Sequence, residues 1–284
     1  NALNHLPYIR SLAAELEMYR TRFPPGHWCS PVPSLQEIEK RSSRLFSRED
    51  DLHGIDLNTE EQLSFLQKLG ACKEETPFYD ESRRIRYNID NALFSTDDGP
   101  ILSCMMRVLK PQRIIEIGSG MSSACMLDTS DMYLNGNTHF TFIDPYPERL
   151  HNILMKEDYK RTTIIEKEIQ DVNTAIFQEL SANDILFIDS SHIMKIGSDL
   201  HTEIFEILPA LKPGVYIHFH DIRYPFQYFE PILKAGYFWN EAYFLRAFLQ
   251  YNNSFKIVFW LNYLLNKHNA EVQKHMPFLP VDIK

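Results

Sequence analysis

The strongest constraint on the fold is a predicted strand that runs directly into a glycine turn and then a helix. Residues 114–117 are apolar except for Glu116. Gly118 and Gly120 follow at once, and helical spacing continues over residues 121–132. Glycine lets the backbone come close to a ligand, and the first turn of a helix presents free N–H groups. The pattern therefore predicts a ligand-binding turn at the carboxyl end of a buried strand.

From about residue 98 onward, short apolar runs alternate with helical segments. This alternation is typical of a parallel sheet that is buried on both faces and joined by right-handed crossovers. We therefore predict an α/β fold with a Rossmann-like sheet. The predicted strands cover residues 113–117, 138–143, 162–166, 185–188, 215–219 and 255–260, and the predicted helices cover residues 99–110, 121–132, 174–180 and 198–211, with another from about residue 147.

The sequence before this alternation predicts helices without strands. Apolar residues at helical spacing indicate a helix over residues 3–22, which the segment Phe23-Pro24-Pro25-Gly26 ends. Ser34 and Glu37 have the spacing of a capping box for a second helix, and a third helix is expected to begin near Thr59.

We therefore divide the chain into an N-terminal helical extension, residues 1–95, and a cofactor-binding domain, residues 96–284. The extension leads directly into the predicted sheet. We expect it either to cover the bound substrate as a lid or to form the contact of a homo-oligomer.

Charge and composition narrow the class of partner. The chain has 38 acidic and 29 basic residues, a formal net charge of -9, and no dense run of Lys and Arg. It therefore lacks the electrostatic footprint of a nucleic-acid-binding protein, and a small-molecule acceptor is favoured. Because no stretch of about 18 consecutive apolar residues occurs, we expect no membrane span.

The cysteines indicate the redox compartment. Cys29, Cys72, Cys104 and Cys125 form no C-x-x-C pair, and four in 284 residues do not resemble a disulfide framework. We therefore expect reduced thiols and a cytoplasmic location.

The residues around the glycine turn distinguish two classes of cofactor. A dinucleotide fingerprint would require a third glycine where Ser123 stands. Glu116 suits a ligand with a cationic amine, because a carboxylate accepts charge-assisted hydrogen bonds. Asp144, at the end of the second strand, is placed to accept the ribose hydroxyls, and Asp171, after the third strand, is placed to reach the adenine amino group.

The motifs E-I-G-S-G, F-I-D-P-Y, Q-D-V, D-I-L-F-I-D-S-S-H and L-K-P-G-V-Y-I-H-F-H-D occur in this order. They resemble the class I S-adenosylmethionine-dependent methyltransferases, and more narrowly the branch known as methyltransferase domain 24. The chain is also similar to macrocin and rhamnosyl O-methyltransferases and to cephalosporin-hydroxylase-like proteins. The resemblance implies a closing antiparallel strand, and no convincing one is found in the sequence. It implies that S-adenosylmethionine is bound by Glu116, Gly118, Gly120, Asp144 and Asp171, with Asn91 and Ser95 near its methionine end.

The ends of the fourth and fifth predicted strands carry Asp189, His220 and Asp221, which should share one crevice. Resemblance to metal-dependent relatives such as the catechol and macrocin enzymes implies that these three residues hold a divalent metal, which would lower the pKa of an acceptor hydroxyl. His220 departs from the usual all-oxygen ligands. Because imidazole suits zinc, iron or manganese better than magnesium, the identity of the metal stays open.

Without a metal, His192 or His220 would act as the general base, beside Asp189. His218 shares a strand face with His220, with Phe219 opposite, and a buried strand would make His218 a core histidine.

Structural interpretations stand beside these roles. Glu116 would be a buried carboxylate satisfied by backbone donors, Asp144 a cap for the turn after it, and Asp171 a cap for the helix over 174–180. His192 would only cap its loop. The aromatic residues in 224–229 and 238–239 would belong to the core or an interface rather than to an acceptor pocket.

The function that this sequence favours is O-methyl transfer from S-adenosylmethionine to a hydroxyl of a small molecule, such as a sugar or a natural product. Two alternatives stay open. One is a metal-dependent enzyme on the same fold that does not methylate, and the other is a catalytically silent cofactor-binding partner of another protein.

Overall fold

The computed structural model describes residues 7–18, 22–47, 51–72, 78, 85–94 and 97–279. The chain divides into two compact units, one formed by residues 1–47 with 229–238 and the other by residues 48–228 with 239–284. This division reflects which residues pack together, and it differs from the predicted boundary at residue 95. Whether residues 1–95 act as a functional lid or oligomer contact stays a prediction.

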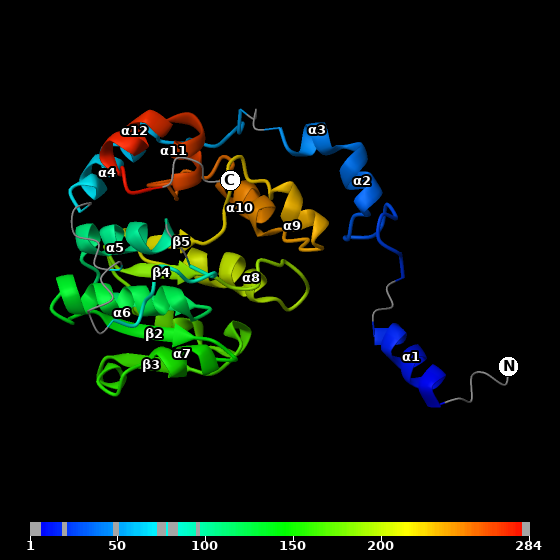
Figure 1. The fold of residues 1–284 in the computed structure, drawn as a ribbon, viewed down its shortest axis with the longest axis horizontal. Coiled ribbons are helices and arrows are strands. Elements are labelled where there is room, and N and C mark those ends of the chain that lie inside the picture. The colour runs from blue at the N-terminus through cyan, green and yellow to red at the C-terminus, as the bar shows by residue number, and fades with distance from the viewer. Residues whose placement is uncertain are drawn as a thin grey trace. The chain divides into compact units, whose positions relative to one another are not determined.

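The larger unit is built on a five-stranded parallel sheet in the order β3-β2-β1-β4-β5 (Figure 1). This confirms the predicted Rossmann-like α/β fold, with strand bounds within one residue of the predicted ones. The strands are β1 Arg113–Ile117, β2 His139–Ile143, β3 Thr162–Ile165, β4 Ile185–Ile188 and β5 Tyr216–Phe219.

The register brings the carboxyl ends of the central strands to one level. Ile117 of β1 pairs with Ile143 of β2 and with Ile188 of β4, which in turn pairs with Phe219 of β5. The residues that follow these strand ends therefore lie next to one another at one edge, the edge where open α/β sheets bind ligands.

Alternation along the strands separates two buried faces. One face carries Ile115, Ile117, Leu186 and Ile188, which pack into a core with residues 169–180 and 200–208. The helices on that side are η4 Ile169–Asp171, η5 Thr174–Glu179, α8 Asp199–Thr202, the π-helix η6 Glu203–Ile207 and η7 Leu208–Ala210. The helix predicted over 198–211 is thus α-helical only in its first turn.

The other face of the sheet is covered by α5 Asp98–Leu109 and α6 Met121–Tyr133, which pack against each other. Glu116 and Ile114 point to this side, and Glu116 accepts hydrogen bonds from two serines at the start of α6. The remaining short helices at the sheet are α7 Glu148–Ile153 and η3 Asp158–Lys160.

The C-terminal part forms helices, one of which, α12 Asn269–His275, packs on α4 Thr59–Gly70. The helices are α10 Glu241–Leu249, α11 Leu261–Lys267 and α12, and α4 packs against α5 and α12 (Figure 1). The predicted third helix near Thr59 is confirmed.

The sixth strand predicted over residues 255–260 is wrong, because this segment has no strand structure. Its backbone groups are taken by side chains near the start of α4: the Trp260 N–H donates to Gln62 Oε1 (2.7 Å), and Asn58 Nδ2 donates to the Ile257 carbonyl (3.4 Å). Aromatic and β-branched residues give the same signal in a strand as in any well-packed extended segment.

The smaller unit contains α1 Pro7–Met18, α2 Leu35–Lys40, α3 Ser42–Leu45 and α9 Glu230–Lys234. The capping box predicted from Ser34 and Glu37 is present at the start of α2, with both hydrogen bonds formed. Of the helix predicted over 3–22, residues 3–6 and 19–21 lie outside the described residues.

Two expectations about composition can be compared with the structure. All four cysteines are free thiols, and three of them are buried. Within the described ranges, no helix combines the length and the apolar character needed to cross a bilayer.

Candidate cofactor and acceptor site

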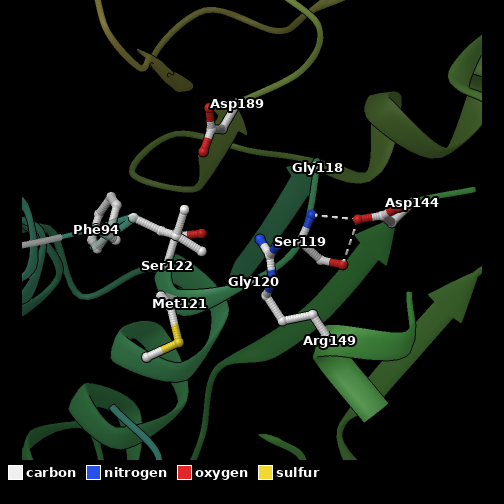
Figure 2. Close-up of a pocket in the computed structure, with 10 residues that line it drawn as sticks. Phe94, Gly118, Ser119, Gly120, Met121, Ser122, Asp144, Arg149 and Asp189 are labelled. Atoms are coloured by element: carbon white, nitrogen blue, oxygen red, sulfur yellow. Dashed lines mark hydrogen bonds between the residues drawn. The ribbon is translucent and has the colours of Figure 1, made fainter. Parts of the chain in front are cut away.

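A cavity of about 210 Å³ opens at the carboxyl edge of the sheet (Figure 2). Four of the residues predicted for the site line it, namely Gly118, Gly120, Asp144 and Asp189. They follow the level ends of β1, β2 and β4, as the parallel register requires. The other lining residues are Leu93, Phe94, Ser119, Met121, Ser122 and Arg149.

The two glycines of the turn serve different purposes. Gly118 has φ +82°, and a Cβ there would lie 1.9 Å from the carbonyl oxygen of Asp189. Glycine is therefore required at this position by the close approach of the chain after β4. A Cβ on Gly120 would point toward Arg149, 3.5 Å from its Cδ. Gly120 thus leaves space at the cavity wall, which fits a bound ligand.

Asp144 both fixes the turn and faces the cavity. Its Oδ2 accepts hydrogen bonds from the backbone N–H of Ser119 (2.9 Å) and from Ser119 Oγ (3.0 Å), and its Oδ1 accepts from the Tyr146 N–H (2.8 Å) (Figure 2). The carboxylate is therefore held in one orientation while it remains partly exposed to the cavity. The interpretation of Asp144 as a cap of the turn is therefore compatible with its interpretation as a ligand-binding carboxylate.

Glu116 lies behind the turn and does not line the cavity. It is fully buried and accepts hydrogen bonds from the hydroxyls of Ser122 and Ser123, and Ser123 Oγ accepts from the Gly120 N–H (2.9 Å). Burial raises the pKa of Glu116 to about 8, against the lowering effect of the two serines. Glu116 is thus a buried carboxylate, as in the structural interpretation, but its donors are two serine hydroxyls of α6 rather than backbone groups.

Asn91 acts on the cavity through its loop. Its Nδ2 donates to the carbonyls of Asn88 and Phe94 (both 2.7 Å), and its Oδ1 accepts from the N–H groups of Leu93 (3.0 Å) and Phe94 (2.7 Å). The amide is therefore saturated by the loop that places Leu93 and Phe94 at the cavity. Ser95, predicted beside it, lies outside the described residues.

Asp171 is exposed in η4 and does not line the cavity. It does not cap the helix after it either, because Asn173 accepts the hydrogen bond from the Ala175 N–H (3.0 Å) at that position. Its contact with an adenine group stays a prediction.

On the acceptor side, His192 is buried between two carboxylates. Its Nδ1 lies 2.6 Å from Glu241 Oε2, and its Nε2 lies 3.5 Å from Asp189 Oδ1. Burial alone would lower the pKa of His192, but hydrogen bonds with Asp189 and Glu241 outweigh it and raise the pKa to about 10. His192 is therefore an imidazolium at neutral pH.

The backbone of His192 is held as firmly as its ring. The residue has φ +60°, a conformation that non-glycine residues adopt at a cost of about 1–3 kcal/mol. Its carbonyl accepts hydrogen bonds from the N–H groups of Asn240 (3.1 Å) and Glu241 (3.2 Å). The ring of Trp239 packs on the imidazole at 4.6 Å. The start of α10 thus fixes both the position and the orientation of His192.

Asp189 contacts His192 and is itself one of the residues that line the cavity. Burial raises the pKa of Asp189, but the hydrogen bond with His192 and the positive charge of that imidazolium help to outweigh this and lower it. Asp189 is therefore ionised, and it lines the same cavity as Asp144 (Figure 2).

His220 is buried behind Phe94, with ring centroids 5.3 Å apart, and does not line the cavity. Its Nδ1 lies 3.5 Å from His218 Nε2, which places both rings on one face of β5 as predicted. His218 stacks on Phe187 at 4.1 Å. Desolvation, with His220 nearby, lowers the pKa of His218 to about 3, so His218 is a neutral core histidine.

The residues predicted to hold a metal do not gather into a metal site. Asp221 is exposed, and its Oδ1 lies 4.0 Å from His220 Nε2. Within the part of the chain that the structure describes, no group of three or more His, Cys, Asp or Glu side chains is arranged to hold a metal ion. As they are arranged here, Asp189, His220 and Asp221 therefore do not fit a metal.

The aromatic residues of the segment after β5 mostly build the core. Tyr224 and Phe226 pack on Trp260, with centroids 5.6 Å and 4.5 Å away, and neither lines the cavity. Trp239 belongs to the site through His192.

Sequence reasoning missed Glu241 and Arg149. Glu241 is 49 residues from His192 along the chain, and nothing local marks it. Arg149 stands in the first turn of the helix after Asp144, a position that proximity to the acid could have indicated.

Comparisons with known proteins agree with this site. A family model described as a methyltransferase domain matches residues 115–222. A protein of Archaeoglobus fulgidus, described only as uncharacterized, is 33% identical over 172 residues, which are 57% of this chain and 76% of that protein.

Two solved structures show weaker likeness. The SAH-bound methyltransferase PaMTH1 of Podospora anserina is 19% identical and covers 66% of this chain and 71% of its own, with a TM-score of 0.32. A putative protein-L-isoaspartate O-methyltransferase of Plasmodium falciparum, in complex with S-adenosyl-L-homocysteine, is 18% identical and covers 66% of this chain and 84% of its own, with a TM-score of 0.29. These TM-scores are too low to bear on the function of this chain.

A parallel sheet with a glycine turn after β1 and an acid after β2 defines a Rossmann-like domain that binds a nucleoside-containing cofactor. The family match contains this turn and both cavity acids, Asp144 and Asp189. Over residues 115–222 the chain carries a methyltransferase domain of the methyltransferase domain 24 family, a branch of the class I S-adenosylmethionine-dependent methyltransferases.

Proposed function

We propose that this protein transfers a methyl group from S-adenosylmethionine to a hydroxyl of a small molecule. The observation that carries the proposal is the placement of an ionised carboxylate, Asp189, on the wall of the cavity that also holds Asp144 and the glycine turn. The bound cofactor would supply an electrophilic methyl group on its sulfonium, so the chemistry left to the protein is to orient and deprotonate the acceptor.

Asp144 would hold the ribose of the cofactor. Its carboxylate is already oriented by Ser119 and Tyr146, so little conformational freedom is lost when the ribose hydroxyls donate to it. The cavity of about 210 Å³ is smaller than the roughly 300–1,000 Å³ of pockets that enclose drug-sized ligands. Binding would therefore open it, and the exposed side chains Leu93 and Arg149 at its wall are placed to move.

Asp189 would accept the hydrogen bond of the acceptor hydroxyl and take its proton at a carboxylate oxygen as the new O–C bond forms and the S–C bond breaks. His192 is a poor base at neutral pH, because both ring nitrogens face carboxylates and the pKa is about 10. His220 does not reach the cavity wall. His192 would instead hold Asp189 in place, and Glu241 would hold His192.

A small acceptor fits the charge of the chain better than a nucleic acid does. The net charge is -9, and the cavity carries two carboxylates and one guanidinium. A polyanionic acceptor would be repelled from such a site. A neutral polyhydroxyl compound such as a sugar or a natural product would not be.

The cofactor is tested by calorimetric titration with S-adenosylhomocysteine. We expect saturable one-to-one binding, and we expect Asp144→Ala to weaken it by a factor of ten or more, about 1.4 kcal/mol. Glu206→Ala is the matched control, because it removes an exposed acid that does not line the cavity and has no predicted role in cofactor binding. Absence of binding by the folded protein would refute the proposal.

The acceptor is tested by release of S-adenosylhomocysteine over a panel of sugars, phenols and polyketide alcohols, with and without added divalent metal. We expect turnover with at least one hydroxyl compound, independent of metal, and a large loss in Asp189→Asn. Normal cofactor binding without turnover on the whole panel would favour a silent cofactor-binding protein instead.

A further inference from the structure

Arg149 is the cation among the residues that line the cavity, where Asp144 and Asp189 are the anions. It is the second residue of α7, and its side chain extends from that helix toward Ser119 and Gly120 (Figure 2). The guanidinium runs beside Gly120, because a Cβ built there would lie 3.6 Å from Arg149 Nη1. A larger residue at position 120 would push the guanidinium away from this wall.

The guanidinium of Arg149 has no ion-pair or hydrogen-bond partner among the described residues. Two other arginines of the same unit are paired: Arg86 Nη1 lies 2.6 Å from Asp128 Oδ1, and Arg161 Nη2 lies 2.6 Å from Asp131 Oδ1. Arg149 does not pair even with Asp144 on the same cavity wall. Its five donors are therefore available to a ligand.

The N–H groups of the three turn residues 118–120 are not free for an anionic ligand. The Gly118 N–H donates to the Ile143 carbonyl (3.0 Å), the Ser119 N–H to Asp144 (2.9 Å) and the Gly120 N–H to Ser123 Oγ (2.9 Å). A glycine turn often binds anions through such groups, but here all three are already committed. A negative charge that enters this part of the cavity would find its cationic partner in Arg149.

S-Adenosylmethionine carries one anionic group, the carboxylate of its amino-acid part. We propose that Arg149 binds this carboxylate and so makes the site selective for the cofactor with its amino-acid part intact. The proposal rests on the proposed function, since it takes S-adenosylmethionine as the ligand. A guanidinium matches a carboxylate with two parallel hydrogen bonds, which a lysine cannot reproduce.

The test compares two ligands by calorimetry, S-adenosylhomocysteine and 5′-methylthioadenosine, which keeps the adenosine and the sulfur but lacks the carboxylate. We expect Arg149→Met to weaken S-adenosylhomocysteine binding by about tenfold or more, the effect of one charge-assisted contact. Binding of 5′-methylthioadenosine should change by less than twofold. Arg149→Lys should recover part of the lost affinity.

Arg113→Met is the matched control. It also removes one exposed positive charge, but its guanidinium lies 3.7 Å from Glu179 and outside the cavity. It should leave both affinities unchanged.

The outcomes separate this proposal from the proposed function. Equal losses for both ligands in Arg149→Met would show that Arg149 contacts the adenosine, and tighter binding of either would show that it blocks the cavity. Both results overturn the carboxylate assignment and leave the cofactor in place. If the wild-type protein binds neither ligand, the proposed function fails, and this assignment fails with it.

Discussion

Replacing Glu241 by Gln tests whether the buried carboxylate–imidazolium–carboxylate arrangement is real. The change keeps the size of the side chain and removes the negative charge of a carboxylate whose Oε2 lies 2.6 Å from His192 Nδ1. The pKa of His192 rises from 6.5 to about 10 in the fold. At about 1.4 kcal/mol per unit of pKa, that rise corresponds to at most about 5 kcal/mol of stability.

Glu241 supplies only part of this stabilisation, because Asp189 also contacts the ring. Burial raises the pKa of Glu241 itself, so the desolvation of its carboxylate offsets some of the gain. We therefore expect Glu241→Gln to lower the free energy of unfolding by about 2 kcal/mol near pH 6.

The pH dependence gives the sharper readout. A histidine whose pKa is raised by the fold stabilises fully below its unfolded value of about 6.5, and that stability is lost as the pH rises through about 10. The cost of Glu241→Gln should therefore be largest at pH 6 and should shrink toward pH 10. Urea unfolding at pH 6, 8 and 10 measures it.

Glu271→Gln is the control, because its exposed pair with Lys274 (3.2 Å) should contribute less than about 1 kcal/mol at any pH. The same cost for Glu241→Gln at pH 6 and pH 10, or no cost at all, would show that His192 is not held as an imidazolium.

Three further predictions concern the turn and the acceptor. Gly118→Ala should destabilise the fold by more than about 3 kcal/mol in urea unfolding, because its Cβ would lie 1.9 Å from the Asp189 carbonyl oxygen. Glu116→Gln should become more stable relative to wild type as the pH rises from 4.5 to 8, by at most about 1.4 kcal/mol per pH unit. The reason is that a carboxyl with a pKa of about 8 keeps its proton in the folded protein, whereas the unfolded chain releases that proton above pH 4.5. Urea unfolding at about pH 5 and about pH 8 checks this sign. The rate of methyl transfer should be flat from pH 6 to 9, because Asp189 stays ionised and His192 stays protonated; a rate that climbs over this range would assign the base to a histidine.

The sequence predicts the sheet well because its strands are marked locally. Each buried strand is an apolar run between helical segments, and the parallel register then places Gly118, Asp144 and Asp189 at one edge without further information. The segment over 255–260 has the same local signal. It fails as a strand because Gln62 and Asn58, about two hundred residues earlier in the chain, take its backbone groups.

The site could be predicted only where local pattern determines it. Asp144 and Asp189 follow strands, so their positions are fixed by the sheet. The orientation of Glu116 depends on which way the hydroxyls of Ser122 and Ser123 turn, and the state of His192 depends on Glu241, which the fold brings in from α10. No periodicity or motif in the sequence marks either of these interactions.

The charges around the acceptor give a physical reason for an aspartate rather than a histidine at the cavity wall. Before transfer, the proposed site would hold a sulfonium cation and the carboxylate of Asp189. Transfer of the methyl group leaves a neutral thioether, and uptake of the acceptor proton leaves a neutral Asp189. Both charges therefore disappear together. A histidine base would instead become a cation as the sulfonium is lost, and a positive charge would remain at the site. His192 and Glu241 keep their opposite charges throughout, and so they hold Asp189 in place without adding to the net charge that the cavity must accommodate.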